Sequence, residues 1–158
     1  MQINIGKIED YKPIKFINGK YVISWGLVNS EESAPKWYYF IKDYKPSIFD
    51  IKNEIESYIN ECTKNNIINN FRWNNMSIAL TLEDQLDYKL LFDITMLKDG
   101  DNLPETVKFK YKNQNIFYTF ESLDEMKEFI IEMNDHIRRC ILFGNEWKES
   151  IDYTVYDI

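Results

Sequence analysis

Two sets of residues in this sequence have types and spacings that suit chemistry. His136 stands four positions before Cys140, one helical turn away, so an imidazole could activate a thiol for nucleophilic attack. Glu83, Asp84 and Asp87 form a cluster of carboxylates, the ligand type that hard cations prefer. The place of each set in the chain also predicts a purely structural role.

Neither set matches the pattern that catalysis or metal binding requires. Cys140 falls on the apolar stripe of a predicted helix, and no signature of a cysteine enzyme surrounds it. The carboxylates fall in the first turn of another predicted helix, where the partial positive charge of the helix N-terminus stabilises them. The sequence has no phosphate-binding glycine loop, no GxSxG elbow and no HExxH motif. We therefore expect no enzymatic activity, no cofactor and no metal; an enzyme that uses His136 and Cys140 remains an alternative.

Composition excludes several classes of protein. The chain has 158 residues, of which 44% are hydrophobic and 28% are charged, as in an ordinary globular protein. Its net charge is −7, with the acidic excess in residues 47–158, which argues against binding to nucleic acid. No apolar run approaches the roughly 18 residues of a membrane-spanning helix, so we expect no membrane partner. The opening MQINIGKIEDYK lacks the apolar segment of a secretory signal, and Cys62 and Cys140 lie outside any CxxC pair, so we expect reduced thiols in a protein that is not exported.

The first part of the chain is predicted to form strands. Asn18 and Gly19 lie between two strand-like runs, and this dipeptide tolerates the positive φ angles of a tight hairpin turn. A further strand is predicted at residues 36–42, KWYYFIK. Ser47, with Asp50 three positions later, predicts the start of a helix at about residues 48–65. This bridging helix carries one apolar stripe, formed by Ile48, Ile51, Ile55, Tyr58, Ile59 and Cys62.

A hairpin followed by a helix is predicted next. In FRWNNMSIAL, residues 71–80, apolar side chains alternate on either side of an Asn-Asn pair that can supply a turn. Thr81 is predicted to cap a helix over residues 82–98, with Gly100 available for a left-handed exit. Apolar residues continue a stripe along this helix: Leu82, Leu86, Leu90, Phe92 or Asp93, Ile94 and Leu97.

The same order of elements then returns. Residues 107–120 predict two short strands about a polar turn, and Ser122 with Glu125 predicts a capping box before a third helix that Gly144 ends. The repeat is either a ββα duplication or a convergent local pattern. The predicted buried face of the third helix consists of Met126, Phe129, Ile130, Met133, Ile137, Cys140 and Ile141.

These elements predict an α+β fold. An N-terminal antiparallel β segment and a bridging helix precede two hairpin-helix units, whose helices pack on an antiparallel sheet. We expect residues 1–46 to form a β-rich attachment segment, and residues 47–158 to form the helix and the two ββα units with an extended C-terminal tail.

Aromatic residues are the candidates for contacts between proteins. Both faces of the strand at residues 37–40 would be apolar, which suits burial between two layers or between two subunits. The β-rich end IDYTVYDI would make an added strand on a neighbouring chain. Deleting residues 152–158 should then leave the monomer folded but weaken assembly. The predicted interface anchors are Trp37, Tyr39, Tyr153 and Tyr156.

Residues 67–152 resemble a phage domain of unassigned function. This domain occurs in tail and baseplate proteins and at the ends of tail-fibre assembly proteins, notably in phages that infect Bacteroidetes. The segment KPSIFDIKNEIESYINE is similar to the helix that commonly leads into it. The matching motifs follow in order: FRWNNMSIALTLEDQLDYK, KDGDNLPETVKFKYKNQ, IFYTFESLDEMKEFI and HIRRCILFGNEWKESID.

The resemblance implies a non-enzymatic structural or adaptor component of a tailed-phage virion, at the tail, the baseplate or the fibre attachment. Its partners would be other virion proteins, in a symmetric assembly that repeats the chain. It would reside in the virion tail, and in the host cytoplasm before assembly. The alternative is a tail-fibre assembly factor, a chaperone that leaves before maturation.

Overall fold

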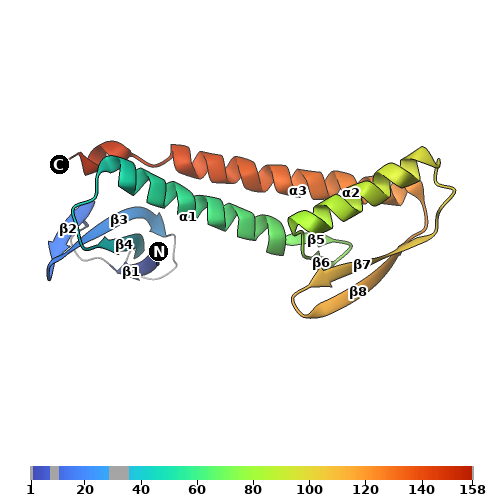
Figure 1. The fold of residues 1–158 in the computed structure, drawn as a ribbon, viewed down its shortest axis with the longest axis horizontal. Coiled ribbons are helices and arrows are strands. Elements are labelled where there is room, and N and C mark those ends of the chain that lie inside the picture. The colour runs from blue at the N-terminus through green and yellow to red at the C-terminus, as the bar shows by residue number, and fades with distance from the viewer. Residues whose placement is uncertain (1, 8–10, 29–35, 158) are drawn as a thin grey trace. The chain divides into compact units, whose positions relative to one another are not determined.

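The chain folds as an α+β protein, which confirms the predicted class. The computed structural model describes residues 2–7, 11–28 and 36–157. They form two compact units, one of residues 1–60 with 145–158 and the other of residues 61–144 (Figure 1). Residues 47–60 and 145–158 are thus grouped with the N-terminal strands, which differs from the predicted division after residue 46.

The first unit contains a four-stranded antiparallel sheet with the strand order β1-β4-β3-β2. The predicted turn between β2 and β3 is confirmed, since Asn18 and Gly19 have φ angles of 51° and 78°. The strand predicted at residues 36–42 is β4. Helix α1 covers one face of this sheet (Figure 1). The strands are β1 (Asn4–Lys7), β2 (Ile14–Ile17), β3 (Lys20–Val28) and β4 (Lys36–Lys42).

The core of the first unit lies between this sheet and α1 (Ile48–Asn69). Isoleucines at helical spacing on α1 bury their side chains against inward-facing residues of β3 and β4, as the predicted stripe requires. The fully buried side chains are Ile51, Ile55 and Ile59 on the helix and Ile23, Trp25 and Phe40 on the sheet.

Helix α1 begins as predicted. The backbone N–H of Ser47 donates to Asp50 Oδ2 at 3.0 Å, and the N–H of Asp50 donates to Ser47 Oγ at 3.1 Å. Hydrogen bonds from the Ser47 hydroxyl and backbone hold the pKa of the Asp50 carboxyl below its usual range. The helix ends later than the predicted residue 65, and the carbonyl of Ile68 in its last turn accepts from the N–H of Leu80 at 2.9 Å.

The second unit contains two hairpins and α2 (Leu82–Leu97). Asn74 and Asn75 form the first turn with φ angles of 47° and 62°, so the predicted hairpin is confirmed. The hairpins form separate two-stranded ladders rather than one continuous sheet, and Ala79 N–H donates to Lys110 O between them at 2.6 Å. Their strands are β5 (Phe71–Trp73), β6 (Met76–Ile78), β7 (Glu105–Tyr111) and β8 (Gln114–Phe120).

An aromatic cluster forms the core of the second unit. Phe129 of α3 (Leu123–Glu149) lies at its centre, and its ring centroid is 5.1 to 5.9 Å from five other ring centroids. Most of these pairs meet edge to face, the arrangement that the charge distribution of aromatic rings favours. The five rings come from both hairpins and from α2: Phe71, Trp73, Tyr88, Phe109 and Phe120.

The predicted capping box of α3 is half formed. The N–H of Glu125 donates to Ser122 Oγ at 3.2 Å, as expected. The Glu125 carboxylate, however, accepts from the N–H of Glu121 at 3.0 Å and from the hydroxyl of Tyr118. This carboxylate therefore ties the start of α3 to the end of β8.

Gly144 does not end α3, contrary to the prediction. The helix continues to Glu149, and Gly144 is a buried position within it. A Cβ at Gly144 would lie 2.2 Å from Thr63 Oγ1 and 3.3 Å from Thr63 Cβ, so the glycine permits close approach of α1. The inner face of α3 passes through the partly buried Ile137 and Cys140 to the buried Gly144, and Ile141 lies beside it, 46% exposed. The prediction that Ile141 is buried was therefore wrong.

We predict that Gly144→Ala destabilises the protein. Alanine normally favours a helix over glycine by about 0.5–1 kcal/mol, but overpacking against Thr63 should cost about 1–3 kcal/mol. Urea denaturation followed by circular dichroism measures the difference. The matched background is Thr63→Ala, which removes Oγ1 and the γ-methyl group. In the Thr63→Ala background, Gly144→Ala should leave the free energy of unfolding unchanged or raise it. An equal loss of stability in both backgrounds would contradict the close contact.

Candidate protein-binding surfaces

The predicted interface residues Trp37 and Tyr39 lie on β4, on the face of the sheet opposite α1. Tyr38 of β4 pairs with Trp25 of β3, and both side chains lie on the core side of the sheet. Because side chains alternate along a strand, those of Trp37 and Tyr39 point to the other side. Trp37 and Tyr39 are partly buried, and Trp37 stacks on Tyr11 with ring centroids 3.9 Å apart. Their assignment to an interface stays a prediction.

The C-terminal segment is not the predicted strand. Tyr153–Tyr156 form a 3-10 helix, η1, because Asp152 Oδ1 accepts from the N–H of Thr154 at 2.9 Å and turns the chain. Hydrogen bonds from the hydroxyl and the backbone N–H of Thr154 hold the pKa of the Asp152 carboxyl below its usual range. Tyr153 is partly buried, and burial raises its pKa to about 12.

Tyr156 belongs to the core of the first unit. Its side chain is 4% exposed, and its hydroxyl donates to the carbonyl oxygen of Ser24 at 2.8 Å. The expectation that the tail lies outside the core was therefore wrong for this residue. Tyr156 packs within its own chain and cannot also serve as a free anchor on a neighbouring one.

The pair of His136 and Cys140 has a structural explanation. His136 Nε2 lies 3.2 Å from the carbonyl oxygens of Asn66 and Ile67 in the last turn of α1. An Nε2–H donated to these carbonyls leaves no lone pair on that atom to accept the proton of the Cys140 thiol, whose sulfur is 3.8 Å away. Burial also raises the pKa of Cys140, which favours the unreactive thiol.

The carboxylate cluster is divided between two faces of α2. Asp84 is buried and completes a capping box with Thr81: Asp84 N–H donates to Thr81 Oγ1 at 3.2 Å, and Thr81 N–H donates to Asp84 Oδ2 at 3.1 Å. Lys110 Nζ lies 3.5 Å from Asp84 Oδ1. Glu83 and Asp87 are exposed instead. Within residues 2–7, 11–28 and 36–157, no group of three or more histidine, cysteine or acidic side chains is placed to hold a metal ion.

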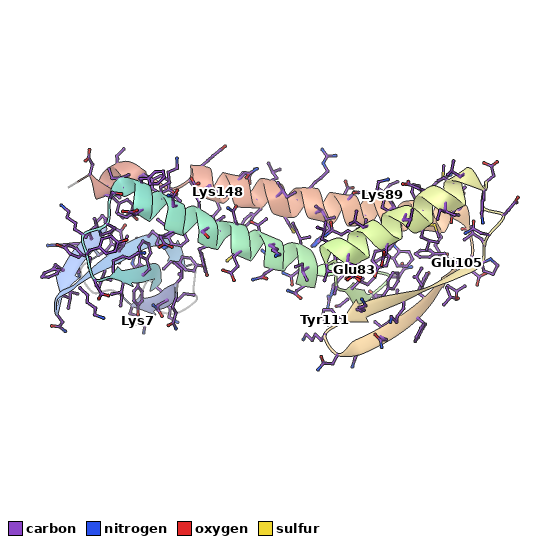
Figure 2. The ribbon with its side chains drawn as sticks, viewed as in Figure 1. Lys7, Glu83, Lys89, Glu105, Tyr111 and Lys148 are labelled. Atoms are coloured by element: carbon purple, nitrogen blue, oxygen red, sulfur yellow. The ribbon has the colours of Figure 1, made fainter. Side chains whose placement is uncertain are left out.

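The apolar stripe predicted along α2 faces outward, except for Phe92, which is partly buried against the core of the second unit. Its exposed fractions run from 39% at Ile94 to 86% at Leu97. Figure 2 shows the side chains of α2, with Glu83 and Lys89 labelled, in the unit where Glu105 and Tyr111 mark the two ends of β7. We call this outward face the leucine stripe, and it consists of Leu82, Leu86, Leu90, Ile94 and Leu97.

Contacts at both ends of α2 turn the leucine stripe outward. Asp84 is held at the N-terminal end, and near the C-terminal end the buried Thr95 Oγ1 accepts from Asn102 Nδ2 at 3.0 Å. Between them Tyr88 packs against the aromatic cluster, with its ring centroid 5.5 Å from those of Phe109 and Phe129. Because Asp84, Tyr88 and Thr95 share the inner face, the leucines must occupy the outer one.

A groove of about 380 Å³ lies beside the leucine stripe, between α2 and α3. Leu82, Leu86 and Phe92 line it from α2. Apolar side chains also line it from α3, namely Ile130, Met133 and Ile137. The groove thus continues the apolar surface of the stripe onto a second helix.

The polar side chains in the groove already have partners within the chain. Gln85 Nε2 donates to Leu80 O and Asn134 Nδ2 donates to Ile130 O, each at 2.9 Å. Lys89 Nζ donates to Asp93 Oδ2 at 2.6 Å. A ligand in the groove would therefore gain mainly apolar contact, which argues against an ion or a small polar molecule.

Comparisons with family models, curated proteins and solved structures gave no match to this chain. The resemblance of residues 67–152 to a phage tail domain therefore stays a prediction. None of the helices in the described ranges is long and apolar enough to cross a membrane.

We predict that the first unit needs the side chain of Tyr156. Tyr156→Phe should cost about 0.5–1.5 kcal/mol, since it removes only the hydrogen bond to Ser24. Tyr156→Ala should cost about 3–5 kcal/mol, because it also leaves a cavity. Thermal unfolding measures both, with Val155→Ala as the matched control at a partly exposed neighbour. Unchanged stability of Tyr156→Ala would show that the tail is not part of the core.

Proposed function

We propose that this protein is a non-enzymatic adaptor that binds another protein as a structural component of a tailed-phage virion, at the tail, the baseplate or the fibre attachment. The observation that carries the binding function is the leucine stripe on α2, together with the apolar groove beside it. Contiguous exposed apolar side chains cost solvation free energy in the free protein, and covering them with a partner recovers it.

Structural roles of the reactive groups support an adaptor over an enzyme. His136 donates to backbone carbonyls, Asp84 caps a helix, and the pKa of Cys140 is raised. The first two side chains are engaged in contacts that stabilise the fold, and the third is held as an unreactive thiol, which argues against their use in turnover. The groove also offers a substrate no polar group that lacks a partner among those described above.

The virion assignment rests on the sequence resemblance of residues 67–152. In a symmetric particle each copy would present the same leucine stripe to an equivalent partner. The partly buried Trp37 and Tyr39, on the face of β4 opposite α1, would then be a second contact region, toward another virion protein. A tail-fibre assembly factor is the alternative, because a chaperone would use the same apolar surface transiently.

We predict that mass spectrometry of purified phage particles will detect this chain in fixed stoichiometry with a tail protein. Fixed stoichiometry is expected because a structural component occupies a set number of equivalent positions. Detection only in the lysate of infected cells would favour the assembly factor. Absence from both the particles and their assembly intermediates would contradict both forms of the proposal.

A further inference from the structure

The leucine stripe has the dimensions of a helix-binding surface. It extends over the 16 residues of α2, from Leu82 to Leu97, or about 22 Å along the helix axis. The groove against α3 runs beside it and shares Leu82 and Leu86 with it. A partner helix of about four turns would cover the stripe and place one row of side chains in the groove.

An extended strand fits this surface less well than a helix. A strand adds to a sheet edge, where unpaired backbone N–H and C=O groups can bond with it. The surface between α2 and α3 is made of two helices, whose backbone groups pair within each helix. An amphipathic helix satisfies its own backbone hydrogen bonds, so it can bury its apolar face here without leaving polar groups unpaired.

The charges around the stripe favour a basic partner. Glu83 and Asp87 are exposed on α2 near the leucines, whereas Lys89 is already paired with Asp93. The outer face of α2 is therefore net negative. A second copy of this chain, packed with its α2 parallel, would place the same acidic side chains against each other. An anionic lipid surface would repel them.

We infer that the surface of α2 and α3 binds a basic amphipathic helix of another protein, with the partner's apolar side chains on Leu86 and Leu90 and its lysines or arginines beside Glu83 and Asp87. The inference rests on the proposed adaptor function and specifies its binding surface and partner class. It does not depend on which virion protein supplies the helix.

A synthetic peptide tests the inference with the full-length protein. The probe is a capped, fluorescent peptide of about 18 residues, with leucines at helical spacing on one face and lysines on the other. One control peptide carries glutamates in place of the lysines, and a second has the same composition in an order that has no apolar face. Fluorescence anisotropy should show binding of the lysine peptide and at least tenfold weaker binding of both controls.

Protein variants distinguish binding at this surface from nonspecific electrostatic attraction between a basic peptide and an acidic protein. Leu86→Gln with Leu90→Gln should weaken binding of the lysine peptide at least tenfold. The matched control is Phe117→Gln, which removes a similarly exposed apolar side chain from β8 and should leave the affinity unchanged. Glu83→Gln with Asp87→Asn should weaken binding and reduce its dependence on salt. Circular dichroism confirms that each variant is folded.

Equal affinity of the original protein and the Leu86→Gln, Leu90→Gln variant would overturn the inference. So would a dimer, measured by light scattering, that this variant abolishes, because a second copy would then be the occupant. Co-sedimentation with phosphatidylcholine vesicles that depends on the same leucines would assign the surface to lipid instead. Detection of the chain in particles tests the adaptor function separately: if it is present there but fails to bind the peptide, only the partner class is wrong.

Discussion

The position of Asp84 determines which face of α2 meets solvent, and the surface of the second unit depends on it. A buried carboxylate is costly unless hydrogen bonds and an opposite charge compensate it. Thr81 supplies the hydrogen bonds and Lys110 supplies the positive charge. Both can reach the Asp84 carboxylate only while it points inward. Turning the helix to bury its leucines would break this cap and withdraw Tyr88 from the aromatic cluster.

Short-range signals in the sequence were sufficient to predict most of the elements. The Asn-Gly and Asn-Asn turns, and the Ser47 and Thr81 caps, act within a few residues, so their physical effect can be read locally. At Asp152 the local composition misled, because two hydrogen bonds from Thr154 to its carboxylate turn a β-rich sequence into a 3-10 helix.

Contacts between distant residues account for what the sequence did not predict. Gly144 resembles a helix terminator in isolation, and only Thr63 on another helix shows that its lack of a Cβ is needed for packing. Tyr156 joins the core through Ser24, which is 132 positions away. For α2, periodicity identified an apolar stripe but not the side of the helix that faces the core. Trp37 and Tyr39 could be proposed as interface residues from composition, whereas the outward orientation of Leu86 and Leu90 required the fold.

The proposed function requires a partner to cover the leucine stripe in the assembled particle. Maleimide labelling of a Leu90→Cys variant, with Cys62 and Cys140 replaced by serine, measures this most directly. We expect fast labelling in the free protein and strong protection in particles, while Lys108→Cys, at an exposed position of β7, labels equally fast in both. Fast labelling of Leu90→Cys in particles that contain the protein would contradict the account.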